Sequence, residues 1–335
     1  MRSNPSSSEA ARPNPSTGRL PRYAVGIVNY RSYPELERAL RSVAGQSFPA
    51  VETVVADLEG GGSVAQRIRD EFSSARWEVL PNVGYAAASN RCLEWLAQAH
   101  PGLEFVLLLN ADVELEPDFA SALLSEMREV PEAVLGTGKL LRDDARTLDS
   151  TGIVLPRNRR PRDRGSEQRD AGQYDRVEFV WGVSGAALML RLDCLGELAL
   201  EGEVFDEDFF MYHEDTDLAW RAQNLGMRAL YVPTARAIHQ RGWKRSSRFE
   251  RPTALRRHSF KNHYLEIAKN ESLASFVANL PYFVCWEVSR FGYALLRDRA
   301  VLPAYRDAWR AWAPIWRKRK LLRQRMREQA GDSSA

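Results

Sequence analysis

The feature that most constrains this fold is a run of five apolar residues that ends in alternating polar side chains. Residues Phe105–Leu109 are apolar throughout, which predicts a strand buried on both faces of a sheet. Asn110, Asp112 and Glu114 follow at alternate positions, so an extended backbone would point them to one side. An ordinary polar turn would also use Asn and Asp. Oxygen side chains at the carboxyl end of a buried strand equally suit a divalent cation at a ligand-binding edge.

Strands and helices are expected to alternate around this segment. The periodicity predicts strands at residues 23–29, 51–57, 77–80 and 105–109, and helices at 34–43, 64–72, 82–99 and after Pro117. Such alternation predicts a mostly parallel, Rossmann-like sheet with helices on both faces. Asn29, Asp57 and Asp112 would then lie together at the carboxyl edge of this sheet. The sequence has no GxGxxG after the first strand and no GxxxxGK[ST], which argues against a dinucleotide enzyme and a P-loop NTPase.

Size and composition allow one large domain or a core domain with an appendage. The chain has 335 residues, of which 44% are hydrophobic, so a core can form. The formal net charge of +3 is uneven, because arginine gathers in residues 157–169 and after Arg317. Basic patches of this kind suit phosphate-bearing partners or an anionic membrane surface. Three widely spaced cysteines argue against a zinc site and a disulfide framework: Cys92, Cys194 and Cys285.

The two ends of the chain are expected to be disordered tails, at residues 1–20 and 329–335. The first is rich in Ser, Pro and Asn and has no apolar segment of the kind found in signal peptides. The chain has no run of about eighteen uncharged apolar residues, so we expect no orthodox membrane span. A reducing, cytoplasmic setting is the default expectation.

Regular alternation stops after residue 140. Residues 157–169 form a charged loop, which is either a mobile surface excursion or a lid whose arginines bind phosphates. Residues 179–190 are predicted to form a strand, a turn and a second strand. Gly182 and Gly185 would let a backbone or a substrate approach that turn closely.

A second acidic cluster lies at residues 204–221. Four aromatic residues precede His213, and the polar run His213–Asp217 then opens a helix that ends at Gly226. Capping and helix-dipole effects account for one or two acids in a first turn, but not for the whole run. A partly desolvated carboxylate there would have a raised pKa and could act as a general base. His239 follows a short strand and is either structural or a cation ligand.

These segments together resemble the family 2 glycosyltransferases of the GT-A fold, and in particular their bacterial rhamnosyltransferase-like branch. The similarity covers about residues 23–270, which defines a predicted catalytic domain at 21–270. Its signatures are Val28-Asn29-Tyr30, the segments 82–90, 109–113 and 185–191, and the run 205–221, which is the most specific.

The resemblance implies roles for four residues in the nucleotide site. Asp57 would bind the base, Asn29 and Asn90 would line the site, and Gly84 would allow close approach. The residues after Asp57 depart from the Asn or Asp beside Ser that is usual in relatives. The nucleotide of the donor, dTDP or UDP, therefore stays open.

The resemblance also implies a metal site. Asn110 and Asp112 would form a DxD-type motif, in which Asp112 binds Mg²⁺ or Mn²⁺ on the donor diphosphate and His239 completes the metal shell. A cation would neutralise the charge that develops on the diphosphate leaving group. Asparagine in the first position of the motif is common in this branch and implies modest metal affinity.

On the acceptor side, the resemblance assigns Asp215 as the general base that deprotonates a hydroxyl, with Trp181, Gly182 and Glu214 nearby. The implied activity is inverting transfer of a sugar, with rhamnose as the best candidate, to a glycan or lipid-linked acceptor in cell-envelope polysaccharide synthesis. A non-catalytic nucleotide-sugar-binding or scaffold protein is the alternative. A nucleotidyltransferase is a weaker alternative, because the first strand lacks a basic, glycine-rich phosphate loop after it.

Residues 271–328 are predicted to form a helical appendage. One helical stripe of apolar residues runs through it, and tryptophans alternate with basic residues towards Lys320. This pattern favours contact with the inner leaflet of a membrane through residues 273–320, although a helical appendage packed on the catalytic domain is the alternative. No nucleic-acid-binding motif is present, so we expect no nucleic-acid partner.

Overall fold

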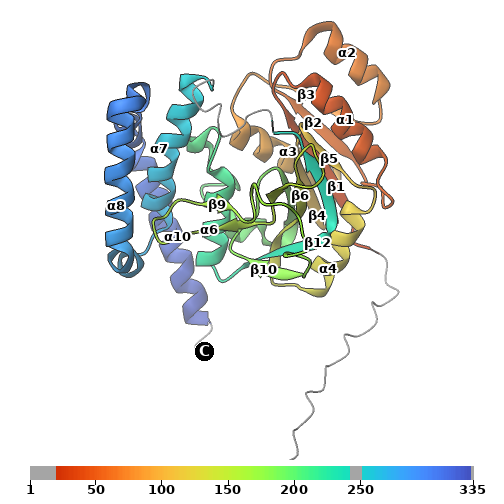
Figure 1. The fold of residues 1–335 in the computed structure, drawn as a ribbon. Coiled ribbons are helices and arrows are strands. Elements are labelled where there is room, and N and C mark those ends of the chain that lie inside the picture. The colour runs from red at the N-terminus through yellow and green to blue at the C-terminus, as the bar shows by residue number, and fades with distance from the viewer. Residues whose placement is uncertain (1–19, 242–250, 333–335) are drawn as a thin grey trace, which may run out of the picture.

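The computed structural model describes residues 20–241 and 251–332, which fold around a central mixed sheet (Figure 1). The strands of this sheet are β1 (Tyr23–Asn29), β2 (Thr53–Asp57), β3 (Arg76–Val79), β4 (Phe105–Asn110), β5 (Val113–Leu115), β6 (Ala133–Leu141), β7 (Leu148–Ser150), β10 (Glu178–Val180), β11 (Ala187–Arg191) and β12 (Arg228–His239). Its main path runs β10-β12-β6-β11-β4-β1-β2-β3. A small separate sheet pairs β8 (Ile153–Val154) with β9 (Arg162–Asp163).

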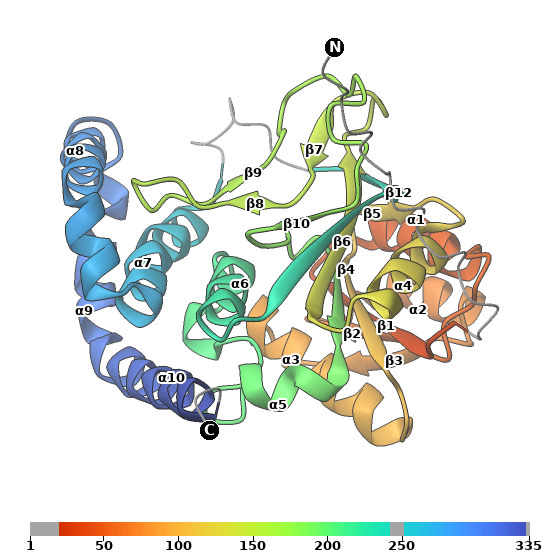
Figure 2. The same ribbon diagram turned by 90° about the horizontal axis from the view of Figure 1, so that it is seen from below.

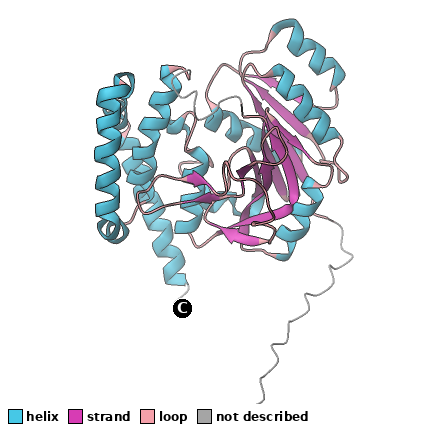
Figure 3. Ribbon diagram, viewed as in Figure 1, coloured by secondary structure: helices cyan, strands magenta, loops and turns pink. Residues whose placement is uncertain are grey.

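Helices cover both faces of the sheet, and a further group lies to one side (Figures 2 and 3). The helices are α1 (Tyr33–Ala44), α2 (Gly62–Glu71), α3 (Tyr85–Ala99), α4 (Phe119–Glu129), α5 (Leu195–Leu198), α6 (Glu214–Asn224), α7 (Thr253–Asn270), α8 (Leu273–Arg297), α9 (Pro303–Arg310) and α10 (Trp312–Asp332). Side chains of β1 alternate between two cores, with Val25 and Ile27 facing α1 and α2, and Ala24 and Val28 facing α3. This double burial explains the uninterrupted apolar strands.

The predicted alternation of strands and helices is present from β1 to α4, and β1, β2, β3 and β4 are parallel. The other half of the sheet is mixed, because β11 lies antiparallel between β4 and β6. The strands predicted within residues 179–190 are β10 and β11, but they pair with other strands and not with each other.

The pairing of β12 with β5 brings the residues that follow β4 beside the end of β12. His239 is opposite Val113 in this antiparallel pair, and the N–H of Gln240 donates to the carbonyl oxygen of Asp112 at 2.8 Å. The register therefore places His239 next to Asp112, although the two residues are far apart in sequence.

The C-terminal helices α8, α9 and α10 pack on the rest of the molecule through α7. Two small cores join them, formed by Phe209, Leu265, Ala308 and Ile315, and by Phe260, Ala294, Val301 and Ala304. Lys318 of α10 also forms a buried ion pair with Asp206 at 2.6 Å. Helix α10 continues to Asp332, so the predicted tail at 329–335 begins inside a helix, while residues 1–19 and 333–335 lie outside the described residues. Among the helices of 20–241 and 251–332, none combines the length and apolarity that a membrane crossing requires.

Candidate active site

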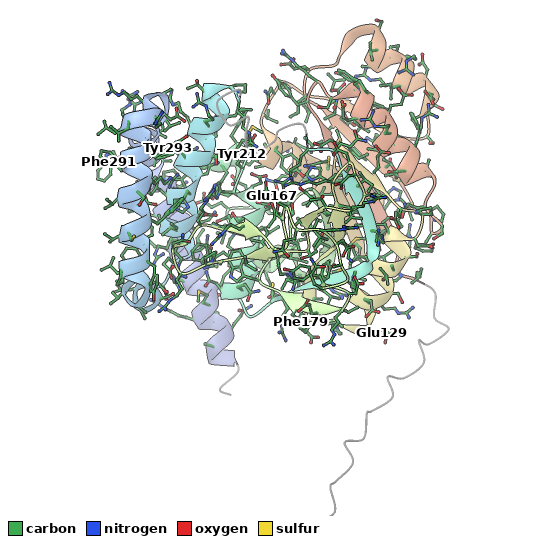
Figure 4. All side chains as sticks on the ribbon, in the orientation of Figure 1. Glu129, Glu167, Phe179, Tyr212, Phe291 and Tyr293 are labelled. Carbon is green, nitrogen blue, oxygen red and sulfur yellow. The ribbon has the colours of Figure 1, made fainter. Side chains whose placement is uncertain are left out.

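A cavity of about 490 Å³ lies at the carboxyl end of β4, next to the first turn of α6. Tyr212, which lines this cavity, lies between the sheet and α7 in Figure 4. The cavity brings together five residues selected from the sequence: Asn110, Asp112, Glu214, Asp215 and His239. Both acidic clusters thus line one cavity, although about a hundred residues separate them.

Asp215 is held in place by two backbone donors. The N–H of Gly185 donates to Oδ2 at 2.9 Å, and the N–H of Thr216 donates to Oδ1 at 2.7 Å. Gly185 is pressed against this side chain, because a Cβ at Gly185 would lie 3.3 Å from the Cβ of Asp215. Burial raises the pKa of Asp215, although these backbone donors oppose the shift. The result is an oriented carboxylate with an enhanced affinity for a proton.

Glu214 is the neighbouring acid in the cavity. Burial, with a further contribution from the charge of Asp215, raises the pKa of Glu214 to about 8. At neutral pH the Glu214 side chain is therefore mostly protonated. Asp215 differs from it in accepting hydrogen bonds from two backbone N–H groups, and acids in different environments can perform different roles in one site.

The loop before these acids is strained. Phe210, Tyr212 and His213 have positive φ values of 65°, 68° and 70°, in the left-handed region that side chains other than glycine rarely adopt. Asn262 of α7 stabilises the loop, because its Nδ2 donates to the carbonyl oxygens of Phe209, Met211 and Tyr212 at 2.8 to 2.9 Å. This strained loop sets the position of the first turn of α6 and hence of Asp215.

A chain of polar side chains reaches the cavity at Asp112 and His239. Nε2 of His239 lies 3.4 Å from Oδ1 of Asp112, and Nδ1 of His239 lies 2.7 Å from Oδ2 of Asp149. Burial opposes a charge on His239, but the hydrogen bonds with Asp112 and Asp149 prevail and raise its pKa to about 9. Asp149 fixes the ring so that Nε2 faces Asp112, which is the arrangement that orients histidine ligands in metal sites.

These residues fit a divalent cation that is shared with a substrate. Oδ1 of Asn110 is buried and has no hydrogen-bond partner among the described residues. This oxygen, close in sequence to Asp112, is therefore available to bind a cation. Within residues 20–241 and 251–332, no cluster of three or more His, Cys, Asp or Glu side chains could hold a metal unaided. Mg²⁺ is often bound by one or two carboxylates together with phosphate oxygens of the substrate, which matches this donor set.

The residues expected to bind the nucleotide base form a separate, closed cluster. Asp57 is fully buried, and its Oδ1 accepts hydrogen bonds from Asn29 at 3.0 Å and from Tyr33 at 3.1 Å. Its Oδ2 pairs with Arg69 at 3.0 Å. Neither Asn29 nor Asp57 lines the cavity. A base could reach this carboxylate only after Tyr33 or Arg69 moves.

Gly84 and Asn90 also face the protein interior. A Cβ at Gly84 would lie 2.5 Å from the ring and from the carbonyl oxygen of Phe210. The group that approaches Gly84 closely is therefore Phe210 of the protein and not a nucleotide. The Asn90 amide donates to the carbonyl oxygen of Phe205 at 2.8 Å and accepts from its N–H at 2.9 Å. Gly84 thus packs against the strained loop and Asn90 holds the segment before it, and neither residue lines the cavity.

Trp181 and Gly182, expected on the acceptor side, lie away from the cavity. Trp181 packs edge-on against Trp220 with ring centres 5.9 Å apart. A Cβ at Gly182 would lie 2.6 Å from the Cβ of Ala219 on α6. Gly182 is therefore a glycine because helix α6 packs closely on it, and this geometry does not support contact with an acceptor.

The comparison that decides the family covers most of the chain. The family described as "Glycosyltransferase like family 2" matches residues 21–261. The chain belongs to this glycosyltransferase family. The family predicted from the sequence is therefore confirmed.

Two curated relatives of this glycosyltransferase carry the same name. Each is an N-acetylglucosaminyl-diphospho-decaprenol L-rhamnosyltransferase of Mycobacterium tuberculosis, from strains CDC 1551 / Oshkosh and ATCC 25618 / H37Rv. The identity is 29% over 242 residues, which cover 65% of this chain and 75% of the relative.

Two solved structures share the fold of this glycosyltransferase. GalNAc-T7, solved with UDP, GalNAc and Mn²⁺, superposes with a TM-score of 0.55 at 13% identity over 75% of this chain, which spans 48% of that longer chain. Residues 1–349 of Staphylococcus aureus TarS give 0.54 at 17% identity over 86% of this chain and 78% of that one. These likenesses, together with the family, confirm the GT-A fold with its helical C-terminal region.

Sequence reasoning about this glycosyltransferase missed Asp149, Asp163 and Arg241. Arg241 and Asp163 line the cavity, and Arg241 pairs with Asp163 at 2.7 Å and with Asp149 at 2.8 Å. Asp149 lies in the three-residue strand β7 and Asp163 in the two-residue strand β9. Strands this short produce no periodicity that could have marked these acids.

The arginine-rich loop connects the active-site wall to α8. Arg157 donates to Asn279 at 3.1 Å and to Tyr282 at 2.9 Å, and Arg159 pairs with Glu271. The loop continues into β9, where Arg162 lines the cavity. We call residues 155–161 the strap. Its arginines at 157 and 159 bind protein groups in this structure, so the strap is neither a free excursion nor a phosphate clamp built from these two side chains.

Proposed function

We propose that this glycosyltransferase transfers a sugar from a nucleotide diphosphate donor to a hydroxyl group, with inversion and with Asp215 as the general base. The observation that carries this proposal is the shared cavity. Asp112 and Asp215 both line it, although they belong to two acidic clusters that lie far apart in the sequence. Transfer with inversion needs a base on one side of the sugar and a stabilised leaving group on the other. A scaffold protein would need neither an oriented carboxylate of raised pKa nor the chain of polar side chains that reaches the same cavity.

The proposed reaction is a single displacement. The acceptor hydroxyl gives its proton to Asp215 as its oxygen forms a bond to the anomeric carbon, and the bond from that carbon to the diphosphate breaks. The two backbone donors at Asp215 fix the carboxylate for this proton transfer. A divalent cation held by Asp112 and His239 would neutralise the departing diphosphate. Asp149 keeps His239 oriented throughout.

For substrates, we propose L-rhamnose carried on dTDP, with UDP as the second candidate nucleotide, and a lipid-linked acceptor of cell-envelope polysaccharide. The support is the name of the curated relatives, which act as rhamnosyltransferases on a diphospho-decaprenol sugar. The closed state of the Asp57 cluster gives no preference between the two nucleotides.

Donor binding should stabilise the folded protein, and more so with metal. A ligand at about a hundred times its Kd raises the free energy of unfolding by about 2.7 kcal/mol. We expect dTDP-rhamnose to raise the Tm, with a further rise when Mn²⁺ or Mg²⁺ is present. Thermal scanning of sugar nucleotides with and without metal measures this.

Two results of the same screen would contradict the proposal. Metal that raises the Tm equally with and without donor would mean that the cation does not bridge donor and protein. A panel in which no sugar nucleotide shifts the Tm would remove the donor class altogether. Transfer of radiolabelled rhamnose to an N-acetylglucosaminyl diphospho-lipid then tests the acceptor.

We further propose that the protein contacts the cytoplasmic face of the inner membrane through the appendage. The apolar stripe predicted on α8 faces outwards, with 75% of Leu273 and 68% of Val288 exposed. Figure 2 shows α8, α9 and α10 along one side of the molecule, away from the sheet. An exposed apolar surface of this extent marks an interaction site, and a membrane holding the lipid-linked acceptor fits it.

A further inference from the structure

A second cavity, of about 590 Å³, lies between α7 and the junction of α9 with α10. Its charged and titratable lining consists of Asp208, Arg257, His258, Lys261, Asp307 and Arg310. The proposed transfer chemistry uses none of these residues. We call it the basic cavity, because its cations outnumber the acids that compensate them.

The two acids of the basic cavity are already paired. Asp307 pairs with Arg257 at 2.5 Å, and Asp208 pairs with Lys318 at 3.0 Å. Lys261 donates to the backbone oxygen of Asp208 at 2.7 Å and has no carboxylate in ion-pair contact within the described part of the chain.

Arg310 is exposed and likewise has no acidic partner among residues 20–241 and 251–332. Two cations thus face the cavity without a carboxylate. Arginine and lysine in such a position bind phosphate oxygens through charge-assisted hydrogen bonds.

Burial is the main cause of the lowered pKa values of His258 and Lys261 in this cavity. Burial, with the charges of Lys261 and Arg257 added, lowers the pKa of His258, which stacks on Phe210 with ring centres 4.9 Å apart. Burial also lowers the pKa of Lys261, although Asp208 and Asp307 oppose the shift. A bound anion would offset both effects.

Three stacked tryptophans lie next to the lining residues of this cavity in sequence. Trp309 and Trp312, on either side of the lining residues Arg310 and Ala311, stack with ring centres 6.4 Å apart. Trp316 continues the stack at 6.1 Å from Trp312, and Trp309 is 74% exposed. Tryptophan beside basic residues is typical of the level of lipid headgroups.

We propose that the basic cavity binds the phosphate group of an anionic membrane phospholipid while the neighbouring tryptophan stack enters the headgroup region. This inference rests on the membrane contact proposed above. The exposed tryptophans favour a lipid over a free phosphate ion, since a soluble anion would gain nothing from exposed aromatic rings. A sugar could stack on these rings, but it would leave Lys261 and Arg310 uncompensated.

The test compares two arginines of the same helix. Arg310 lines the basic cavity, whereas Arg306 is exposed on α9 and does not line it. Full-length wild type, Arg310→Gln and Arg306→Gln are sedimented with vesicles of phosphatidylcholine, with and without phosphatidylglycerol. Loss of one general surface charge near a membrane weakens binding about fivefold. We expect Arg310→Gln to lose about tenfold more than Arg306→Gln on phosphatidylglycerol vesicles, because it also loses a charge-assisted hydrogen bond.

Equal losses for the two variants would overturn the proposal and leave only a general electrostatic attraction. Calorimetry with soluble glycerol phosphate provides a second arm. Binding that depends on Arg310, combined with vesicle binding insensitive to phosphatidylglycerol, would replace the lipid with a free phosphate ligand. Lys261→Gln should reproduce the Arg310→Gln loss, and unchanged Tm values show that the variants are folded.

Failure of the basic cavity and failure of the proposed function are distinguishable. If the wild-type protein binds no vesicle of either composition, the proposed membrane contact is wrong, and the proposed lipid site is then wrong as well. Donor stabilisation and transfer to a soluble acceptor analogue report on the catalytic cavity alone. We expect Arg310→Gln to keep both.

Discussion

Replacing Asp215 with asparagine should reduce the rate of sugar transfer by about 10²- to 10⁴-fold, the usual contribution of a general base. Asparagine can keep the contact with the Gly185 N–H but cannot accept the acceptor proton at neutral pH. We therefore expect a folded protein whose Tm still rises with donor. Steady-state transfer and thermal scanning on the same preparation measure both properties.

Glu214→Gln is the matched control for this variant. Glutamine resembles the protonated glutamate that a pKa of about 8 implies, so the loss at neutral pH should stay within about tenfold. A large loss for Glu214→Gln with near-normal turnover of Asp215→Asn would reverse the assignment of the base.

The pH profile follows from the same assignment. A general base works when deprotonated, and burial raises the pKa of Asp215. The transfer rate should therefore fall as the pH drops through that raised pKa, and the residual rate of Asp215→Asn should lack this acidic limb. A wild-type rate that stays constant down to the ordinary range of an aspartic acid would contradict the raised pKa.

Replacing Asp112 with asparagine should have the second-largest effect, a loss of about 10²-fold or more in metal-stimulated transfer, because charge stabilisation by a cation contributes several kcal/mol. The variant keeps a side chain of the same size but loses the only acid in contact with Nε2 of His239 within the described residues. Titration of activity with Mn²⁺ should show a weaker dependence on metal.

Asp118→Asn serves as the control, because Asp118 is an exposed acid shortly after the same strand segment and lies outside the cavity. It should leave both the rate and the metal titration unchanged. Full activity of Asp112→Asn in the presence of a chelator would exclude the metal-assisted mechanism.

The strands and helices of the first half were predictable because each has a strong local pattern. The five apolar residues that precede Asn110 became β4, and the helical spacing after Pro34 became α1. The antiparallel direction of β11 was not predictable, since a buried strand has the same sequence pattern in either direction. Pairing directions depend on contacts between distant segments that local periodicity does not contain.

The residues of the candidate site were predictable only where a polar side chain lies at the end of a regular strand or helix. Asp112 and Asp215 met this condition, because one follows β4 and the other opens α6. Asp149 did not, because its role depends on the distant His239. The stripe on α8 was visible in the sequence, but a periodic pattern identifies a face and does not tell what covers it.

The strap links the outer helix α8 to the wall of the candidate active site. The strap contacts α8 through Arg157, which donates to Tyr282, and through Arg159, which donates to Ser275. It then continues into β9, where Asp163 pairs with Arg241. Tilting or lifting α8 would break these contacts or pull on the β9 residues. The outer helix and the cavity wall are therefore linked, so a force applied at the periphery would reach the candidate active site through a short length of backbone.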